Sequence, residues 1–384
     1  MVLSESTLLE AREALRKRVD ATLAEVGDEF PYVRDGSTWE TTPNGNWCGG
    51  HWIGLLWFAR DAALATGDED DADRYERAAR SATETVHEYM PRTSMFCGMN
   101  FCYAGFDGYD RTGDRRLYGI GLEGADAMAD AFHEGARQIP LGELDIKGPE
   151  QFRGPESDHG PSGNRIGAVD NVYTAVTVLW RAYEETGDTR FRDAAISHAD
   201  RHLDWYVRDD GRTWHHAVFD DDGGLERQYN ELAHSEETCW SRGQGWNVAG
   251  LARAHAATGA GRYLDALERT VGYYRQRSPA DGVPYWDLAA PVDEDTPRDT
   301  SAAALVADGL LALPESDDTA ALRAYGETIL DSLLSTYLET DPDAPNYGAV
   351  EQGCFNAPGE YATNTELIWT DYYVARLVED ALEE

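Results

Sequence analysis

The stretch Leu179-Trp-Arg-Ala-Tyr-Glu-Glu-Thr-Gly-Asp188 joins the end of one helix to the start of the next. Its glycine suits the left-handed residue that ends a helix, and aspartate is a favoured N-cap. Similar units that end a helix in Thr-Gly occur at 55–68, 109–114 and 251–260. Each predicts an αα-hairpin with a short structural turn and no chemistry of its own.

Longer irregular segments, rich in glycine and aromatic residues, separate these hairpins. They span residues 35–54, 91–107, 139–169, 209–245, 279–302 and 341–364. No strand-like alternation of useful length is present, and no linker divides the 384 residues. We therefore predict an all-α protein, a single-domain (α/α)6 barrel over residues 1–384, with the long loops over one mouth. That mouth is the expected site.

One helix start carries an acid. Asp170 precedes a helix whose apolar residues recur at helical spacing, namely Val172, Val176, Leu179 and Tyr183. Such a helix has a buried face, and its first turn can direct a carboxylate into a cavity at the end of a bundle. Aspartate is also a common N-cap, so capping and catalysis both stay open for Asp170 at this point.

The charge balance is strongly acidic. Asp and Glu number 71 against 33 Lys and Arg, for a formal net charge of -38, and lysine occurs only at Lys17 and Lys147. Such an excess repels itself in dilute buffer and is tolerated where salt screens it, so a halophilic surface is predicted. No basic footprint for nucleic acid exists, and an anionic membrane surface is equally unsuited as a partner.

Cysteine usage and the N-terminus point to the cytoplasm. The five cysteines are odd in number and lack Cys-x-x-Cys spacing, which favours reduced core thiols over disulfides or a zinc site. The first residues have no basic region leading into an apolar core, and no apolar run is long enough to span a bilayer.

Two loops carry candidate binding chemistry. Arg242 lies between Trp240 and Trp246, an arrangement suited to a bidentate grip on a carboxylate with indole faces against a sugar. A solvated arginine beside core tryptophans is the structural alternative. His215 and His216 adjoin in a second loop but lack a third ligand at metal spacing, so no metal or other cofactor is predicted.

Six motifs together resemble the unsaturated glucuronyl hydrolases of glycoside hydrolase family 88, in order and spacing, from Trp47 to Tyr373. The motifs are Asp170-Asn-Val-Tyr, Thr213-Trp-His-His-Ala-Val-Phe-Asp220, Cys239-Trp-Ser-Arg-Gly-Gln-Gly-Trp246, Asp281-Gly-Val-Pro-Tyr-Trp-Asp287, Arg298-Asp-Thr-Ser-Ala-Ala-Ala304 and Leu367-Ile-Trp-Thr-Asp-Tyr-Tyr373. The resemblance implies a six-hairpin barrel and an acidic, haloarchaeal-type member of that family. The implied substrates are sugars with a 4,5-unsaturated uronic acid, the ends that polysaccharide lyases leave.

The resemblance also implies a mechanism. Asp170 would be the general acid and base, protonating C4 of the double bond while water adds at C5, after which the hemiketal rearranges and frees the leaving sugar. Substrate binding would fall to His215, Arg242, Trp246, Trp47 and Trp240.

The chain departs from the family pattern at two positions. Phe96 stands where a second aspartate is usual, and neither Asn100 nor Asp107 restores the pattern. Leu232 replaces a glutamine that would contact the uronate. An altered uronate pocket is expected.

Two other functions therefore stay open. One is a two-carboxylate inverting glycosidase, in which Asp107, Glu236 or Glu237 would be the partner of Asp170. The other is a non-catalytic sugar-binding paralogue that kept the cavity. Activity on saturated glycosides would favour the first of these.

Overall fold

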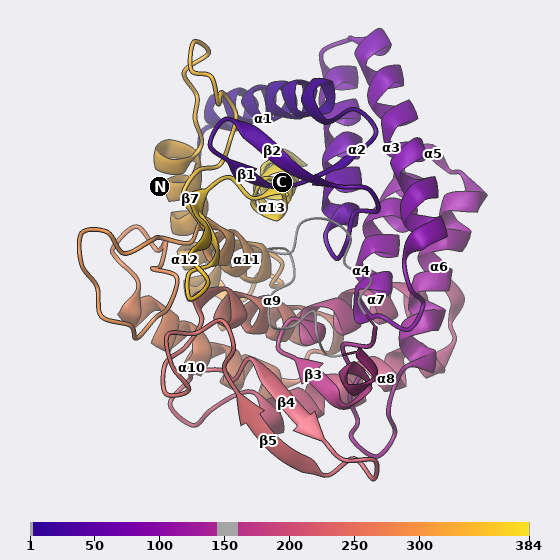
Figure 1. Ribbon diagram of the computed structural model, residues 1–384, viewed down its shortest axis with the longest axis vertical. Coiled ribbons are helices and arrows are strands. Elements are labelled where there is room, and N and C mark those ends of the chain that lie inside the picture. Colours follow the sequence, from indigo (N-terminus) through magenta and orange to yellow (C-terminus); the bar gives the residue numbers. More distant parts are fainter. Residues whose placement is uncertain (1–2, 144–159, 384) are drawn as a thin grey trace.

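The computed structural model describes residues 3–143 and 160–383, and its helices form two concentric layers (Figure 1). The inner layer contains α2 (Gly49–Ala65), α4 (Met95–Phe101), the π-helical turn η1 (Cys102–Phe106), α5 (Asp107–Thr112), α7 (Asn171–Thr186), α9 (Ser241–Thr258), α11 (Thr300–Leu311) and α13 (Ile368–Glu383). The outer layer contains α1 (Glu5–Val26), α3 (Glu69–Tyr89), α6 (Arg115–Asp130), α8 (Thr189–Trp205), α10 (Gly261–Arg277) and α12 (Ala320–Ser332), which continues as the π-helical turn η5 (Leu333–Tyr337). Among the described residues, no helix is both long and apolar enough to cross a membrane.

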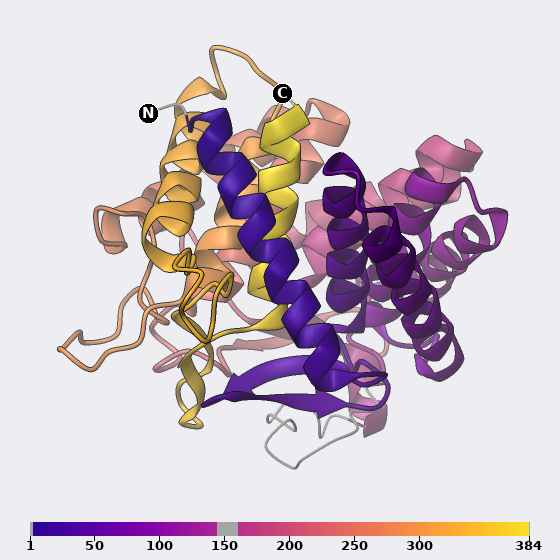
Figure 2. The ribbon, with the colours of Figure 1, turned by 90° about the horizontal axis from the view of Figure 1, so that it is seen from above.

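The six hairpins close into a ring. Five are consecutive in sequence, and the sixth joins the two ends of the chain, because α13 packs against α1. Helix α13 also contacts α11 on one side and α2 on the other, which completes the inner layer. The predicted (α/α)6 barrel is confirmed. Figure 2 shows the β1–β2 hairpin at one end of the helices and the C-terminus at the other.

The Thr-Gly turns behave as predicted. Gly113, Gly187 and Gly259 end their helices in the left-handed conformation, with φ of 68°, 71° and 67°. Asp114 and Asp188 each accept a hydrogen bond from the backbone N–H two residues on, and so cap the following helices. These short turns lie at the end of the ring opposite the long loops.

The prediction of an irregular loop over 91–107 is wrong for most of its length. The chain is helical from Met95, and its glycines serve close packing against α6. A Cβ on Gly105 would lie 2.5 Å from the backbone nitrogen of Gly121, a distance that side chains do not tolerate. Glycine here lets two helices approach closely, which the sequence pattern did not distinguish from a loop.

Seven short strands, not predicted from the sequence, line the mouth. They are β1 (Phe30–Asp35), β2 (Thr38–Thr42), β3 (Ile166–Ala168), β4 (His216–Phe219), β5 (Leu225–Tyr229), β6 (Gly353–Asn356) and β7 (Tyr361–Thr365). They form the antiparallel sheets β1–β2, β3–β4–β5 and β6–β7. A 3₁₀-helix, η4 (Gly160–Arg165), leads into β3. The strands are too short to show a pattern of alternation.

A buried charge cluster lies where α1 and α13 seal the ring. Arg18 donates two hydrogen bonds to Glu366, and both side chains are almost fully buried. Asp371 lies beside Glu366 and accepts a hydrogen bond from the N–H of Val350, at 3.1 Å. Burial, together with the neighbouring Glu366 carboxylate, raises the pKa of Asp371 well above its ordinary value.

This raised pKa predicts a loss of stability as the pH rises. The unfolded chain ionises Asp371 near pH 4, while the folded protein holds the proton, so the free energy of unfolding falls by about 1.4 kcal/mol per pH unit until the folded pKa is passed. Asp371→Asn removes the titration and keeps the hydrogen-bonding shape. Chemical denaturation from pH 5 to pH 8 should therefore give a flatter profile for Asp371→Asn than for the wild type. The exposed control Asp318→Asn should follow the wild type, and parallel profiles for Asp371→Asn and the wild type would contradict the assignment.

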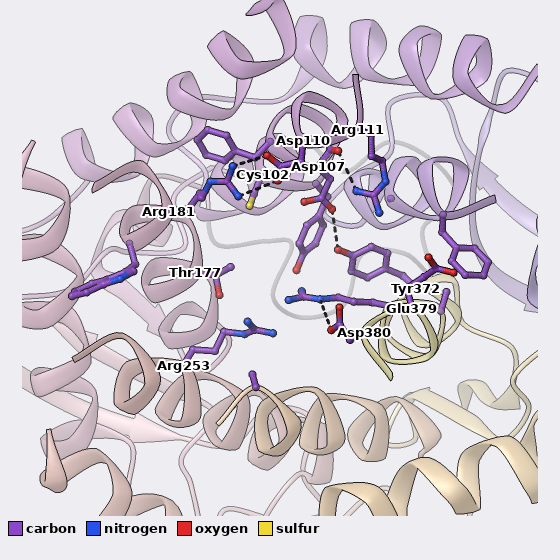
Figure 3. A pocket seen from close by; sticks show the side chains of 18 of the residues that line it. Cys102, Asp107, Asp110, Arg111, Thr177, Arg181, Arg253, Tyr372, Glu379 and Asp380 are labelled. Carbon is purple, nitrogen blue, oxygen red and sulfur yellow. Dashed lines mark hydrogen bonds and ion pairs between the residues drawn. The ribbon is translucent and has the colours of Figure 1, made fainter. Parts of the chain in front are cut away.

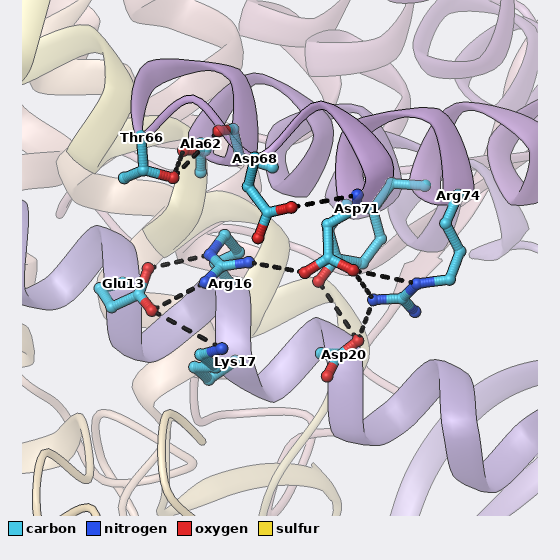
Figure 4. Close-up of polar contacts among 11 residues, drawn as sticks. Glu13, Arg16, Lys17, Asp20, Ala62, Thr66, Asp68, Asp71 and Arg74 are labelled. Atoms are coloured by element: carbon cyan, nitrogen blue, oxygen red, sulfur yellow. Dashed lines mark hydrogen bonds and ion pairs between the residues drawn. The ribbon is translucent and has the colours of Figure 1, made fainter.

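Arginine–carboxylate pairs link the outer helices. Between α1 and α3, Arg16 pairs with Asp71 at 3.3 Å and Arg74 pairs with Asp20 (Figure 4). Arg16 also binds Glu13 within α1, at 2.8 Å. With 71 acidic residues against 33 basic ones, the carboxylates exceed the Lys and Arg side chains by 38. The surface therefore remains strongly negative.

Candidate active site

Asp170 lies between β3 and α7, at the mouth lined by the long loops. Its backbone is helical (φ −58°, ψ −28°), and its side chain makes no capping hydrogen bond to α7. The helix that follows buries the apolar face predicted from the sequence, with Val172, Val176 and Leu179 inside. The Asp170 side chain therefore does not act as the N-cap of α7.

The β3–β4 pairing brings the backbone of His215 next to Val169, the residue before Asp170. The N–H of Val169 donates to the carbonyl oxygen of His215 at 2.9 Å, and Ala168 pairs with His216. The His215 ring stacks on His216, with centroids 3.8 Å apart, and lies 4.5 Å from the ring of Trp240. A small apolar cluster supports this sheet; it contains Ala136, Val169, Trp205, Tyr206, Ala217, Phe219, Leu232, Ala233 and Trp240.

The segment that follows β5 supplies a third polar group that sequence spacing did not reveal. Glu231 Oε2 lies 3.0 Å from His216 Nε2. One potential metal-ligand atom from each of Glu231, His216 and His215 lies within 4.8 Å of the other two. The Glu231 contact fixes the His216 ring, and the stacked rings in turn orient His215. Asn230 adds to this by accepting a hydrogen bond from the His215 N–H at 2.9 Å.

Arg242 is buried in the first turn of α9, with a side chain 2% exposed. Its Nη1 donates to the Cys354 carbonyl at 2.5 Å and pairs with Asp299 Oδ2 at 3.4 Å. Its Nη2 donates to the Phe355 carbonyl at 2.9 Å. A guanidinium carries five N–H donors, so within the described chain the Nε–H and one Nη2–H remain for a ligand. Arg242 is thus not solvated, and it anchors the β6–β7 hairpin over the mouth.

The sequence predicted Arg242 but not its supports. Asp299 is fully buried, and burial raises its pKa even though Arg242 lies beside it. Ser301 Oγ lies 3.2 Å from Arg242 Nη1. Asp299 and Ser301 both belong to the Arg298–Ala304 motif. The resemblance of that motif to the family could have indicated these two residues. The carbonyl acceptors of β6 carry no side-chain signal at all.

The tryptophans occupy different depths. The Trp240 ring lies 4.7 Å from the Arg242 guanidinium. Trp47, half-buried in the loop before α2, donates from Nε1 to the Tyr32 hydroxyl at 2.7 Å and packs 4.7 Å from the Trp369 ring. Trp246 is one turn deeper in α9 and only 2% exposed. Of the three, Trp47 keeps the most exposed ring, whereas Trp240, 5% exposed, and Trp246 are both buried.

Phe96 and Leu232, the two departures from the family pattern, both lie in apolar surroundings. Phe96 is buried, with its ring 5.9 Å from that of Trp47, and Leu232 lies in the apolar cluster beneath the sheet. Asn100 cannot replace a carboxylate at Phe96, because its side chain donates to the carbonyls of Trp47 and Phe96 and accepts from the N–H of Gly50. It ties the Trp47 loop to α4.

The carboxylates considered as partners of Asp170 are placed elsewhere. Asp107 follows Met95 by twelve residues along an inner helix, a rise of about 18 Å toward the opposite end of the ring. Asp107 lines a cavity at that end together with Thr177 and Arg253, and Asp170 does not line it. Glu236 and Glu237 are exposed, and Glu236 accepts a hydrogen bond from the N–H of Asn230. This placement does not favour Asp107 as the partner of Asp170 across a sugar.

Comparisons with known proteins bear on the fold and on the family of this chain. Residues 168–379 match the family model described as Glycosyl Hydrolase Family 88. The unsaturated glucuronyl hydrolase of Bacillus sp. strain GL1 is 30% identical, over 91% of this chain and 90% of that protein. The unsaturated chondroitin disaccharide hydrolase of Streptococcus agalactiae is 25% identical, over 96% and 90%. The crystal structure of the Bacillus sp. GL1 enzyme superposes with a TM-score of 0.83 at 25% identity, covering 97% of this chain and 96% of that one. The protein is a glycoside hydrolase and belongs to family 88.

Proposed function

We infer that this protein releases a 4,5-unsaturated uronic acid from lyase-generated oligosaccharides. The observation that carries the inference is Asp170, which stands at the head of α7 without capping it, beside the His215 segment, in a chain of family 88. Relatives named for unsaturated glucuronyl and chondroitin disaccharide substrates match over nearly the whole chain. They support the same substrate class here.

In the proposed reaction, Asp170 works first as an acid and then as a base. Its proton passes to C4 of the C4=C5 double bond, and the carboxylate then accepts a proton from the water that adds its oxygen to C5. The resulting C5 hemiketal opens, and the leaving sugar departs with its glycosidic oxygen. No displacement at the anomeric carbon is required.

The neighbouring side chains bind and orient the substrate in this proposal. The Nε–H and remaining Nη2–H of Arg242 are the donors for the uronate carboxylate, in the bidentate geometry that arginine favours. The Trp240 and Trp47 rings provide faces for sugar stacking, and Trp246 supports the floor. His215 is oriented by His216 and Asn230 to contact the ring.

The direct test is a panel of lyase-generated disaccharides and oligosaccharides, followed by loss of the ultraviolet absorbance of the conjugated double bond. Turnover of at least one unsaturated substrate is the expected result. Cleavage of saturated glycosides alone would instead favour an inverting glycosidase. Binding of the unsaturated sugars without turnover would favour a non-catalytic paralogue.

Arg242→Lys should weaken capture of the substrate. Lysine keeps the charge but loses the planar fork, at a cost of about 1.5–3 kcal/mol for hydrogen bonds to a charged group, or about 10- to 150-fold in kcat/KM. The melting temperature should also fall, because the Cys354 and Phe355 carbonyls lose a donor. Steady-state kinetics and a thermal melt, with the exposed surface change Arg116→Lys as control, separate the effects. A lower melting temperature with unchanged kinetics would show that Arg242 anchors the β6–β7 hairpin and does not bind the substrate.

We further propose a halophilic, cytoplasmic enzyme that acts as a single catalytic domain. The net charge of -38 supports the first point. All five cysteines are free and buried, which supports a reducing compartment. The continuous ring of six hairpins supports one domain.

A further inference from the structure

A cavity of about 720 Å³ opens at the end of the ring opposite Asp170, and we call it the rear cavity (Figure 3). Its walls are the C-terminal halves of the inner helices α2, α7, α9 and α13, together with η1 and α5. Among the described residues, its lining includes Asp107, considered above as a partner of Asp170, but not Asp170, His215, Arg242 or the site tryptophans. Arg242 and Arg253 stand eleven residues apart on α9, a rise of about 16 Å.

A layer of aromatic side chains separates the rear cavity from the active site. Trp246 packs against Tyr173 and Tyr373, with ring centroids 5.3 and 5.9 Å apart. The hydroxyl groups of Tyr103 and Tyr373 lie 3.0 Å apart below this layer. The side chains in the layer are buried. The rear cavity is therefore a second concave site and not an extension of the first.

One wall of the rear cavity offers hydrogen-bond donors. Arg253 Nη2 binds Asp308 Oδ2 at 2.9 Å, but its buried Nε–H has no acceptor within the described chain. The buried hydroxyl of Thr177 likewise has no partner there. Figure 3 shows Arg253, Thr177 and Arg181 on the same side of the cavity. Both residues line the rear cavity, and donors on one wall suit a carboxylate.

The facing wall offers carboxylates. Glu379 Oε1 is buried and has no donor within the described chain, and Asp380 pairs with Arg376 only at 3.8 Å. Asp107 Oδ2 lies 3.4 Å from the Tyr372 hydroxyl. Figure 3 shows Tyr372, Glu379 and Asp380 across the cavity from Arg253. Burial raises the pKa of Glu379 despite the opposing charges of Arg12 and Arg111, and a further cationic group beside it would offset part of that cost.

The overall charge of the lining decides which ligand fits. The lining contains four arginines (Arg111, Arg181, Arg253 and Arg376) and seven acids (Asp61, Asp107, Asp110, Glu184, Glu379, Asp380 and Glu383), a formal balance of −3. The C-terminal ends of inner helices add partial negative charge. A simple anion is therefore disfavoured, whereas a simple cation would leave the Arg253 and Thr177 donors unused.

We propose that the rear cavity binds a small zwitterion, an amino acid in the broad sense, with its carboxylate at Arg253 and Thr177 and its ammonium group at Glu379 and Asp380. The separation of donors and acceptors on opposite walls selects for a molecule with both charges. This site is independent of the proposed reaction, since binding is measured without any sugar.

Isothermal titration of the full chain tests the site with glycine, 4-aminobutanoate and 6-aminohexanoate, at the salt concentration that keeps the protein folded. Butanoate and butylamine are the matched probes with one charge each. We expect at least one of the amino acids to bind saturably, one per chain, and at least tenfold more tightly than either single-charge probe. Absence of saturable binding by all three, or equal binding of a single-charge probe, would overturn the proposal.

Two isosteric variants locate the site. Thr177→Val removes the hydroxyl, and Glu379→Gln removes the charge while keeping the shape. Each should weaken binding at least fivefold, whereas Glu327→Gln, an exposed change on α12 outside the cavity, should leave it unchanged. A thermal melt checks that each variant is folded. One folded variant of the two is sufficient to test the location of the site. Unchanged binding in a folded Thr177→Val or Glu379→Gln protein would place the ligand elsewhere and refute the assignment.

Discussion

Asp170→Asn is expected to melt near the wild-type temperature and to lose about 10²- to 10⁴-fold in turnover. The range is that of general acid–base catalysis, and asparagine can neither give a proton to C4 nor take one from water. The fold should survive because the Asp170 carboxylate makes no capping hydrogen bond in α7. The loss should lie toward the large end, since Phe96 leaves no carboxylate at that position and Asp107 lies toward the far end of the ring.

The matched control for this variant is Asp188→Asn. Asp188 occupies the N-cap of α8, where its side chain accepts a hydrogen bond from the N–H of Arg190 at 3.0 Å. Asparagine caps about as well, so both stability and turnover should be retained. The paired measurements are a thermal melt and a rate on an unsaturated uronyl disaccharide. A folded Asp170→Asn protein that still turns over would remove Asp170 from the mechanism.

Folding and activity are expected to require high ionic strength. Among 71 acidic and 33 basic residues, repulsion between carboxylates outweighs the attraction of ion pairs such as Arg16–Asp71. At about 1 M salt the Debye length is about 3 Å, so most of that repulsion is screened. The melting temperature should rise steeply between dilute buffer and molar KCl, and activity should fade as salt is removed.

A variant with fewer surface charges separates screening from a general salt effect. Asp317→Asn, Asp318→Asn and Glu327→Gln together remove three exposed carboxylates from α12 and the turn before it. As salt is removed, this triple variant should stay folded down to a lower salt concentration than the wild type. Equal melting temperatures for the wild type in dilute and in molar salt would refute the halophilic assignment.

The parts of this protein that local sequence determined are those governed by short-range chemistry. The Thr-Gly units predicted the hairpin turns, because a left-handed residue favours glycine and the next N-cap favours aspartate; Gly187 and Asp188 show both. Apolar spacing predicted the buried face of α7 and the position of Asp170 at its start. Four such units alternating with long loops predicted a ring of about six hairpins, and the barrel has six.

Tertiary structure alone decided what depends on distant segments meeting. The glycines of α4 and η1 pack against α6, which explains why a glycine-rich segment is helical. The segment after β5 places Glu231 against His216, and Arg242 is held by Asp299 and by carbonyls more than a hundred residues away. The rear cavity joins side chains from separate inner helices at one end of the ring. No local pattern encodes such contacts, because each depends on which helix faces lie side by side once the ring has closed.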